Sequence, residues 1–125
     1  MTTTIDGSAG ITTNAGGSVN PSTNISGVNF SCRAWANFNG VTTVTIAGSG
    51  NIASIVRNST GNYTVTFTTA MADANYSVVG SAPGDNVNPY VFSPATLTTT
   101  GFVITTTRAG LAYTDSSLCC FAVFR

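Results

Sequence analysis

The sequence predicts an all-β fold, and three features of the 125-residue chain support this prediction. Short segments in which apolar and polar residues alternate recur along the chain, as expected for half-buried strands. Clusters of Gly, Asn, Ser and Thr separate these segments at intervals of about 8 to 12 residues, which is typical of β-sandwiches and barrels. Helical spacing is absent, except that residues 69–75 could form a single turn. We therefore expect a compact antiparallel β-sandwich or barrel-like knob.

The chain divides into two regions of different composition. Residues 1–27 consist mainly of Thr, Gly, Ser and Asn, and their sizeable aliphatic residues are few and far apart: Ile5, Ile11, Val19 and Ile25. Such a segment cannot bury enough apolar surface to fold alone. We therefore expect an extended N-terminal arm that is ordered only by neighbouring chains. A β domain is expected over residues 28–125, which are numerous enough to build one hydrophobic core.

The first strand is predicted from Phe30 to Phe38. At a period of two, one face carries Phe30, Cys32, Ala34, Ala36 and Phe38, and the other carries Ser31, Arg33, Trp35 and Asn37. The first set suits the core. Trp35 then lies on the opposite face, where it suits either an anchor of an oligomer interface or packing against a second sheet. A turn is predicted to follow at Asn39 and Gly40.

The middle of the chain is predicted to contain a hairpin. A strand is expected from Val41 to Ile46, and the sequence Gly-Ser-Gly-Asn at residues 48–51 predicts a turn after it. Residues 52–57 and 63–68 then lie on either side of a turn-forming segment at 58–62. In the second of these stretches apolar residues alternate with Thr, so we expect the two to pair as antiparallel strands.

The second half of the chain predicts shorter strands and longer loops. Strands are expected at residues 76–80, 90–92, 96–98 and 102–107. A turn at 99–101 and loops at 81–89 and 108–117 connect them. The apolar run from Leu118 to Phe124 predicts one more strand. Because the sequence stops within this run, we expect that strand to lie inside a sheet.

The charge content excludes several classes of protein. Only 6% of the residues are charged, as four Arg and four Asp, and the net charge is zero. A nucleic-acid-binding protein needs clustered cations, so we expect no nucleic-acid partner. No apolar run approaches the roughly 20 residues of a membrane-spanning helix, and residues 1–10 lack the features of a signal peptide. The polar, uncharged surface suits burial against partners or identical copies, but it is also common in Thr-rich β proteins.

The chain also offers little chemistry for catalysis or for metal and cofactor binding. Without His, Lys or Glu, the four Asp are the main candidate acids and bases, and no two are close in sequence. A glycan hydrolase needs two carboxylates facing each other across a cleft. A zinc site needs about four ligands. Residues 85–88 only loosely match a calcium loop, and a turn stabilised by Asp and Asn explains them better. We expect no enzyme activity, no metal and no cofactor.

The three cysteines are expected to be buried thiols. Cys119 and Cys120 are adjacent, so in a strand their side chains point to opposite faces. A disulfide between Cys32 and Cys119 is the alternative, and it requires their strands to be neighbours.

An ordered series of short motifs identifies a resemblance. These motifs are Cys32–Gly40 (CRAWANFNG), Val44–Ala47, Asn51–Ile55, Gly61–Met71, Asp73–Tyr76 and Phe121–Phe124. The series resembles the C-terminal domain of bacteriophage tail-fibre and related appendage proteins, and it spans residues 28–125. The resemblance implies a compact β domain, usually a homotrimer, at the tip of a virion appendage that meets the host surface. Because residues 1–10 lack the features of a signal peptide, we also expect synthesis in the cytoplasm, here that of the bacterial host.

Two long loops supply the candidate receptor-binding residues, since loops on a rigid β scaffold commonly carry recognition. The candidates have polar or aromatic side chains suited to a host-surface glycan or protein: Asp85, Asn86, Asn88, Tyr90, Arg108, Tyr113 and Asp115. Packing in the core or at a subunit interface is the alternative for the two tyrosines.

A second virion role fits the same resemblance. Tail fibres usually carry a docking module and a shaft, whereas only a short arm precedes this domain. The alternative function is therefore a decoration or cement protein that stabilises the phage head. In that role the arm binds capsid subunits and the β domain projects. In both roles we expect the arm to contact other virion proteins.

Overall fold

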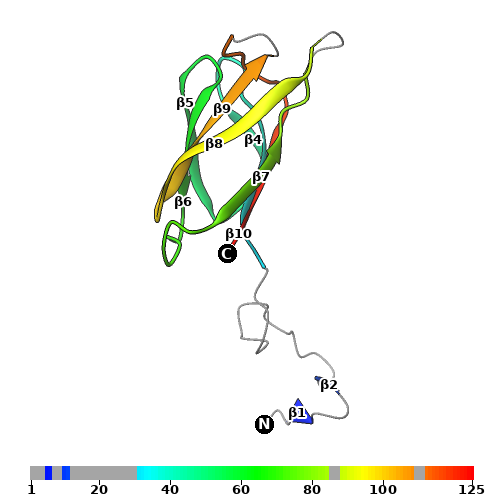
Figure 1. Ribbon diagram of the computed structural model, residues 1–125, viewed down its shortest axis with the longest axis vertical. Coiled ribbons are helices and arrows are strands. Elements are labelled where there is room, and N and C mark those ends of the chain that lie inside the picture. Colours follow the sequence, from blue (N-terminus) through cyan, green and yellow to red (C-terminus); the bar gives the residue numbers. More distant parts are fainter. Residues whose placement is uncertain (1–4, 7–9, 12–30, 85–87, 109–111) are drawn as a thin grey trace.

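The computed structural model describes residues 5–6, 10–11, 31–84, 88–108 and 112–125. Its two main sheets, each of four antiparallel strands, pack face to face (Figure 1). This confirms the all-β prediction, with a sandwich as the architecture. The strands are β1 (Ile5–Asp6), β2 (Gly10–Ile11), β3 (Cys32–Asn39), β4 (Thr45–Gly50), β5 (Ile52–Ser59), β6 (Asn62–Phe67), β7 (Ser77–Ser81), β8 (Tyr90–Thr98), β9 (Gly101–Arg108) and β10 (Cys119–Phe124).

The first sheet has the strand order β4-β3-β10-β7, and the second sheet has the order β5-β6-β9-β8. Strand β10 lies inside the first sheet, where Phe121 is opposite Ala36 of β3 and Gly80 of β7. The prediction that the last strand is internal is therefore confirmed. Strands β1 and β2 pair only with each other among the described residues. The rest of the predicted arm, residues 1–27, lies outside the described residues.

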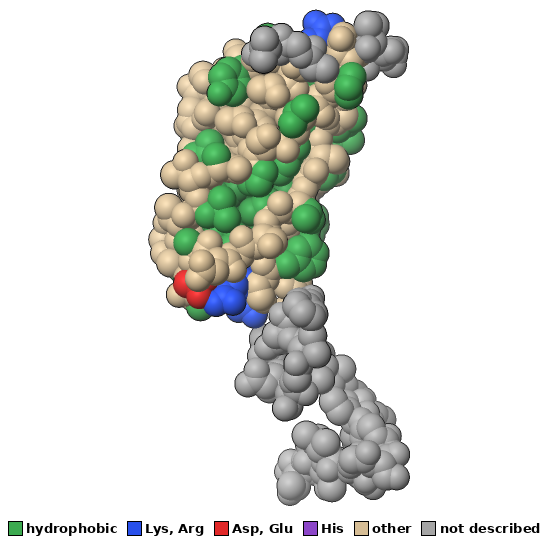
Figure 2. Space-filling view, in the orientation of Figure 1, with side chains coloured by type: hydrophobic (Ala, Val, Ile, Leu, Met, Phe, Trp, Pro, Cys, Tyr) green, Lys and Arg blue, Asp and Glu red, His purple; other side chains and the backbone are tan. Residues whose placement is uncertain are grey.

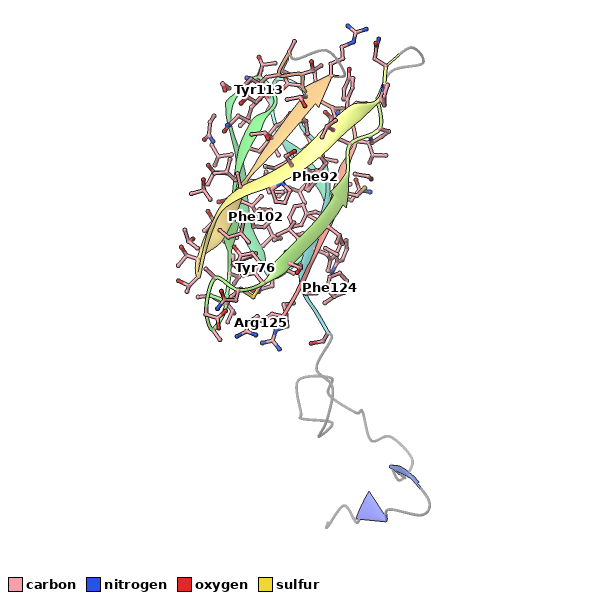
Figure 3. All side chains as sticks on the ribbon, viewed as in Figure 1. Tyr76, Phe92, Phe102, Tyr113, Phe124 and Arg125 are labelled. Atoms are coloured by element: carbon pink, nitrogen blue, oxygen red, sulfur yellow. The ribbon has the colours of Figure 1, made fainter. Side chains whose placement is uncertain are left out.

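Alternate residues of the central strands build the core between the two sheets. The buried apolar residues are Ala34, Ala36, Phe38, Ile55, Tyr63, Val65, Phe67, Met71, Tyr76, Ala82, Phe102, Ile104, Cys119, Phe121 and Val123. Aromatic rings meet edge to face across the interface between the sheets, with centroids 5.4 Å apart for Phe38 and Tyr63 and 5.2 Å apart for Phe102 and Phe121. Figure 3 shows Phe92, Phe102 and Tyr76 between the sheets.

The predicted faces of the first strand are mostly confirmed. Ala34, Ala36 and Phe38 are buried, and the side chain of Trp35 is 45% exposed on the other face. Cys32 was expected in the core, but it is exposed at the start of β3. The pairing of β3 with β10 shifts register near this end of β3, so the alternation does not carry Cys32 inward.

The prediction for residues 41–51 was wrong in its boundaries. Strand β4 begins only at Thr45, and it continues through the two glycines to Gly50. The chain passes to the second sheet at Asn51 alone, whose φ is 57°. The Asn51 side-chain amide donates to the carbonyls of Arg33 at 3.1 Å and Thr69 at 3.0 Å, and these bonds hold the corner. Asn51 adopts the left-handed backbone conformation that makes this turn, a conformation that we expected one of the nearby glycines to adopt.

The hairpin of β5 and β6 is confirmed, with Ile55 opposite Val65. Its turn is shorter than predicted, because Ser59 pairs with Asn62 and leaves only Thr60 and Gly61 between them. Gly61 has φ +62°, and a Cβ there would lie 2.5 Å from the carbonyl oxygen of Thr106. The position therefore requires glycine.

Two further predictions were wrong. Residues 90–92 and 96–98 belong to one strand, β8, which continues through Pro94. Proline is tolerated there because β8 is at the edge of its sheet, so the missing N–H removes no ladder bond. Residues 69–75 form bends and no helical turn. Met71 N–H donates to the carbonyl of Thr99 at 2.8 Å, which ties this segment to the β8–β9 turn.

The sandwich has two distinct ends. At the terminal end, Phe124 is opposite both Cys32 and Ser77, so the arm enters β3 beside the end of β10. At the loop end, Tyr90 is opposite Arg108, where β8 begins and β9 ends. Figure 1 shows the C-terminus far from this second end.

Candidate functional site

Three of the predicted receptor-binding residues come together at the loop end. Tyr90 and Arg108 are opposite each other in the β8–β9 pair. With its amide oriented to accept, the Asn88 side-chain oxygen lies 3.1 Å from Nε of Arg108. Arg108 is exposed, while Tyr90 is half-buried and packs against the core. Much of the Tyr90 side chain therefore packs in the core, which was the alternative to a receptor-binding role.

Tyr113 lies at the same end but on a different surface. It pairs with Thr107, which in turn is opposite Val91 of β8. Residues opposite each other in a sheet share a face, and Thr106 next to Thr107 is buried. Tyr113 is therefore on the outer face of the second sheet, where its side chain is 59% exposed. In Figure 3 it is at the end opposite Phe124 and Arg125. Asp85 and Asn86 lie outside the described residues.

Asp115 is held in a hydrogen-bond network inside the loop end. Its carboxylate accepts from Nε of Arg57 at 3.0 Å and from a terminal nitrogen of Arg57 at 2.8 Å. The backbone N–H of Gly61 and the phenol of Tyr63 also donate to it, each at 2.8 Å. These donors come from β5, the β5–β6 turn and β6. Asp115 therefore fastens the segment after β9 to the second sheet.

The protonation of this network follows from the same contacts. Burial alone would raise the pKa of Asp115, but the bonds from Arg57, Gly61 and Tyr63 outweigh it and lower that pKa. The pKa of Tyr63 is raised, first by burial and then by its bond to Asp115. Asp115 is thus a bound carboxylate at neutral pH. The structure gives it a bracing role, and its side chain is only 14% exposed for contact with a receptor.

The other described carboxylate of the sandwich is also paired. Asp73, at the terminal end, accepts from Nε of Arg125 at 3.0 Å and from the backbone N–H of Asn75 at 2.8 Å. The bond from Arg125 is the main cause of its lowered pKa. In the view of Figure 2, charged side chains are seen only at the two ends of the molecule. Neither Asp73 nor Asp115 is placed to act as a general base.

The cysteines are free thiols in three different environments. Cys119 is buried, Cys120 is half-buried and Cys32 is exposed, which confirms that Cys119 and Cys120 face opposite ways. Burial raises the pKa of Cys119 to about 11. The Cys32–Cys119 disulfide was a wrong alternative. Although β3 and β10 are neighbours, Cys119 is opposite Phe38 while Cys32 is opposite Phe124.

Two classes of site find no support in the described part of the chain. It contains no cluster of three or more acidic or cysteine side chains that could hold a metal ion. It also contains no helix with the length and hydrophobicity needed to span a bilayer.

A shallow trough lies on the outer face of the first sheet. Its lining comes from β3, β7 and β10: Trp35, Ala36, Asn37, Val79, Gly80, Ser81, Cys120, Phe121 and Ala122. Small side chains of β10 form its floor, because Ala122 is opposite both Trp35 and Val79. Sequence reasoning placed Trp35 on this face but missed Val79 and Ala122. Their alternation was visible, but the order of strands that brings them beside Trp35 was not.

Comparison with family models, with curated proteins and with solved structures found no match to this chain. The resemblance to tail-fibre domains therefore stays a prediction.

Proposed function

We propose that this chain is the receptor-binding knob of a bacteriophage virion appendage, and that it binds a host-surface glycan or protein without catalysing a reaction. The observation that carries the proposal is the separation of the two ends of the sandwich. The arm leads into β3 at Cys32, beside the end of β10. The long β7–β8 and β9–β10 connections start or finish at Ser81, Tyr90 and Arg108, at the opposite end.

This arrangement suits a module that is attached at one end and exposed at the other. When the chain is attached through the residues that precede β3, the loop end points away from the particle. Tyr113 and Arg108 are the exposed anchors at that end. Tyrosine and arginine are the residue types that most often dominate binding surfaces. The Asp115 network fixes the described segment that carries Tyr113 to the second sheet, which lowers the entropic cost of binding.

A non-catalytic role is supported by the surroundings of two carboxylates and one thiol. Asp73 and Asp115 are each bound by an arginine. Cys119 is buried with a raised pKa, whereas a catalytic thiol needs a lowered one.

The proposal is tested by binding fluorescently labelled protein to cells of the host bacterium. The double variant Arg108→Ala/Tyr113→Ala should bind at least about tenfold more weakly, because losing an anchor residue costs about 2 kcal/mol or more. Val56→Ala is the matched control, since Val56 is exposed on β5, which β6 separates from the strand that carries Arg108. Equal binding by the double variant and the control would refute the receptor-binding role. If the arm alone were then needed for attachment to virions, the decoration role would be favoured.

A further inference from the structure

The outer face of the first sheet carries an exposed tryptophan ring, that of Trp35, which lies flat on a neighbouring strand. The indole of Trp35 lies along the backbone of β4, over two glycines. A Cβ at Gly50 would be 2.5 Å from Nε1 of Trp35, and a Cβ at Gly48 would be 3.3 Å from Cη2 at the far edge of the ring. A side chain at position 50 would therefore displace the indole, whereas one at position 48 would only crowd it. One face of the ring is therefore supported by β4, while the side chain is 45% exposed.

Beside this flat ring are two polar side chains on the same strand. Asn37 follows Trp35 by two residues, which places it about 7 Å away along β3 on the same face. Arg33 precedes Trp35 by two residues and is exposed where the pairing of β3 with β10 shifts register. Among the described residues, neither the Arg33 guanidinium nor the Asn37 amide forms a hydrogen bond or ion pair through its side chain. Their hydrogen-bonding groups are thus available next to an exposed aromatic face.

We propose that this surface binds a sugar unit of a glycan, stacked on Trp35. A pyranose ring presents a face of C–H groups, which pack on the electron-rich face of an indole, and a rim of hydroxyls, which need donors and acceptors. Asn37 supplies both. Arg33 supplies a planar fork of donors that pairs with a carboxylate, so the surface favours a sugar that carries one. The floor of Cys120 and Ala122 leaves room for the next sugar unit.

A second copy of the chain explains these observations less well. An interface core is depleted in charge, yet the exposed Arg33 is only two residues from Trp35 on β3.

The site is independent of the loop end, so its test does not rest on the proposed receptor role. Trp35 is the only tryptophan in the chain, and its fluorescence reports on this surface alone. The purified protein is titrated with maltotetraose and galacto-oligosaccharide as neutral probes, and with oligogalacturonate and oligosialic acid as acidic ones. We expect a saturable change in emission with a dissociation constant of about 1 mM or below, and tighter binding of an acidic probe.

Four variants make the test specific. Gly50→Ala pushes the indole from its place without removing it and should weaken binding at least fivefold. Asn37→Ala should weaken binding of all probes, and Arg33→Ala should remove the preference for acidic ones. Val56→Ala, on the other sheet, should leave the titration unchanged. Thermal unfolding checks that each variant is folded. If Gly50→Ala is not, the Asn37 and Arg33 variants decide the outcome.

Three results would overturn the proposal. The first is the absence of a saturable change with any of the four probes. The second is equal affinity in the wild type and the Asn37→Ala and Arg33→Ala variants. The third is an emission shift that depends on protein concentration and does not change when oligosaccharide is added. Such a shift would show that the surface is a contact between copies of the chain.

Discussion

The phenol of Tyr63 donates a hydrogen bond to the carboxylate of Asp115 over 2.8 Å, and the same hydroxyl lies 3.2 Å from the carbonyl oxygen of Gly40. The buried side chain of Tyr63, on β6, therefore joins two other parts of the chain. These are Gly40, which directly follows β3, and Asp115 in the segment before β10. No room is left at Gly40 for a larger residue, since a Cβ there would be 2.4 Å from the Tyr63 hydroxyl. The loop end is built around this contact.

The first prediction concerns the stability that Asp115 provides. Replacing Asp115 with Asn removes the negative charge to which Arg57 and Tyr63 donate hydrogen bonds. We expect the free energy of unfolding to fall by about 2 kcal/mol, because hydrogen bonds to charged groups usually contribute this much. Urea denaturation at neutral pH measures this. Asp73→Asn is the control, because its ion pair with Arg125 is exposed and should contribute much less. Similar losses in both variants would contradict the bracing role.

The second prediction is a pH dependence with two sides. The folded pKa of Asp115 is lowered, so its contribution is present above the unfolded value of about 3.9 and is lost as the pH falls through the folded pKa. The folded pKa of Tyr63 is raised, so its contribution is present below about pH 10 and is lost as the pH rises further. We expect stability to be flat from about pH 5 to about pH 10 and to fall on both sides. A series of urea titrations across pH measures this dependence. Asp115→Asn should weaken the acid-side fall, and an unchanged fall would contradict the assignment.

The third prediction distinguishes the thiols. Cys32 is exposed and should react quickly with an aromatic disulfide reagent in the native protein. Cys119 is buried with a pKa of about 11, so it should react only after denaturation. Counting modified thiols by mass spectrometry over time tests this. Rapid modification of Cys119 would mean that β10 separates readily from β3.

The fourth prediction is that the protein is a homotrimer. Its surface carries little charge, and strands β4, β5, β7 and β8 are sheet edges that closed symmetry would protect. Sedimentation velocity at micromolar concentration should give a species of three 12.7 kDa chains. A stable monomer at that concentration would exclude the trimer.

Much of the fold could be predicted from local patterns. Alternation in β3 and β6 gave the inward faces, because a strand buried on one side must alternate. Strand ends were less predictable. Gly48 and Gly50 are typical of a turn, yet they lie in β4 because Trp35 needs open space above them. Pro94 is typical of a break, yet it is tolerated at an edge. Both outcomes depend on neighbouring strands, which a local pattern does not specify.

The candidate site was predictable only in part. The two loops hold polar and aromatic residues, and the structure brings Tyr90 and Arg108 together as neighbours. Asp115 was grouped with Tyr113 because they are close in sequence. Its partners Arg57 and Tyr63 are more than 50 residues away, so only the fold reveals that it is a brace. The supported indole of Trp35 was missed for the same reason.

We propose that the sandwich is a receptor-binding knob at the tip of a virion appendage. The most direct measurement is electron microscopy of intact virions labelled with gold-conjugated antibody against residues 31–125. We expect gold at the far ends of the tail appendages. Gold distributed over the head would contradict it and would favour the decoration role, and virions without any gold would exclude both.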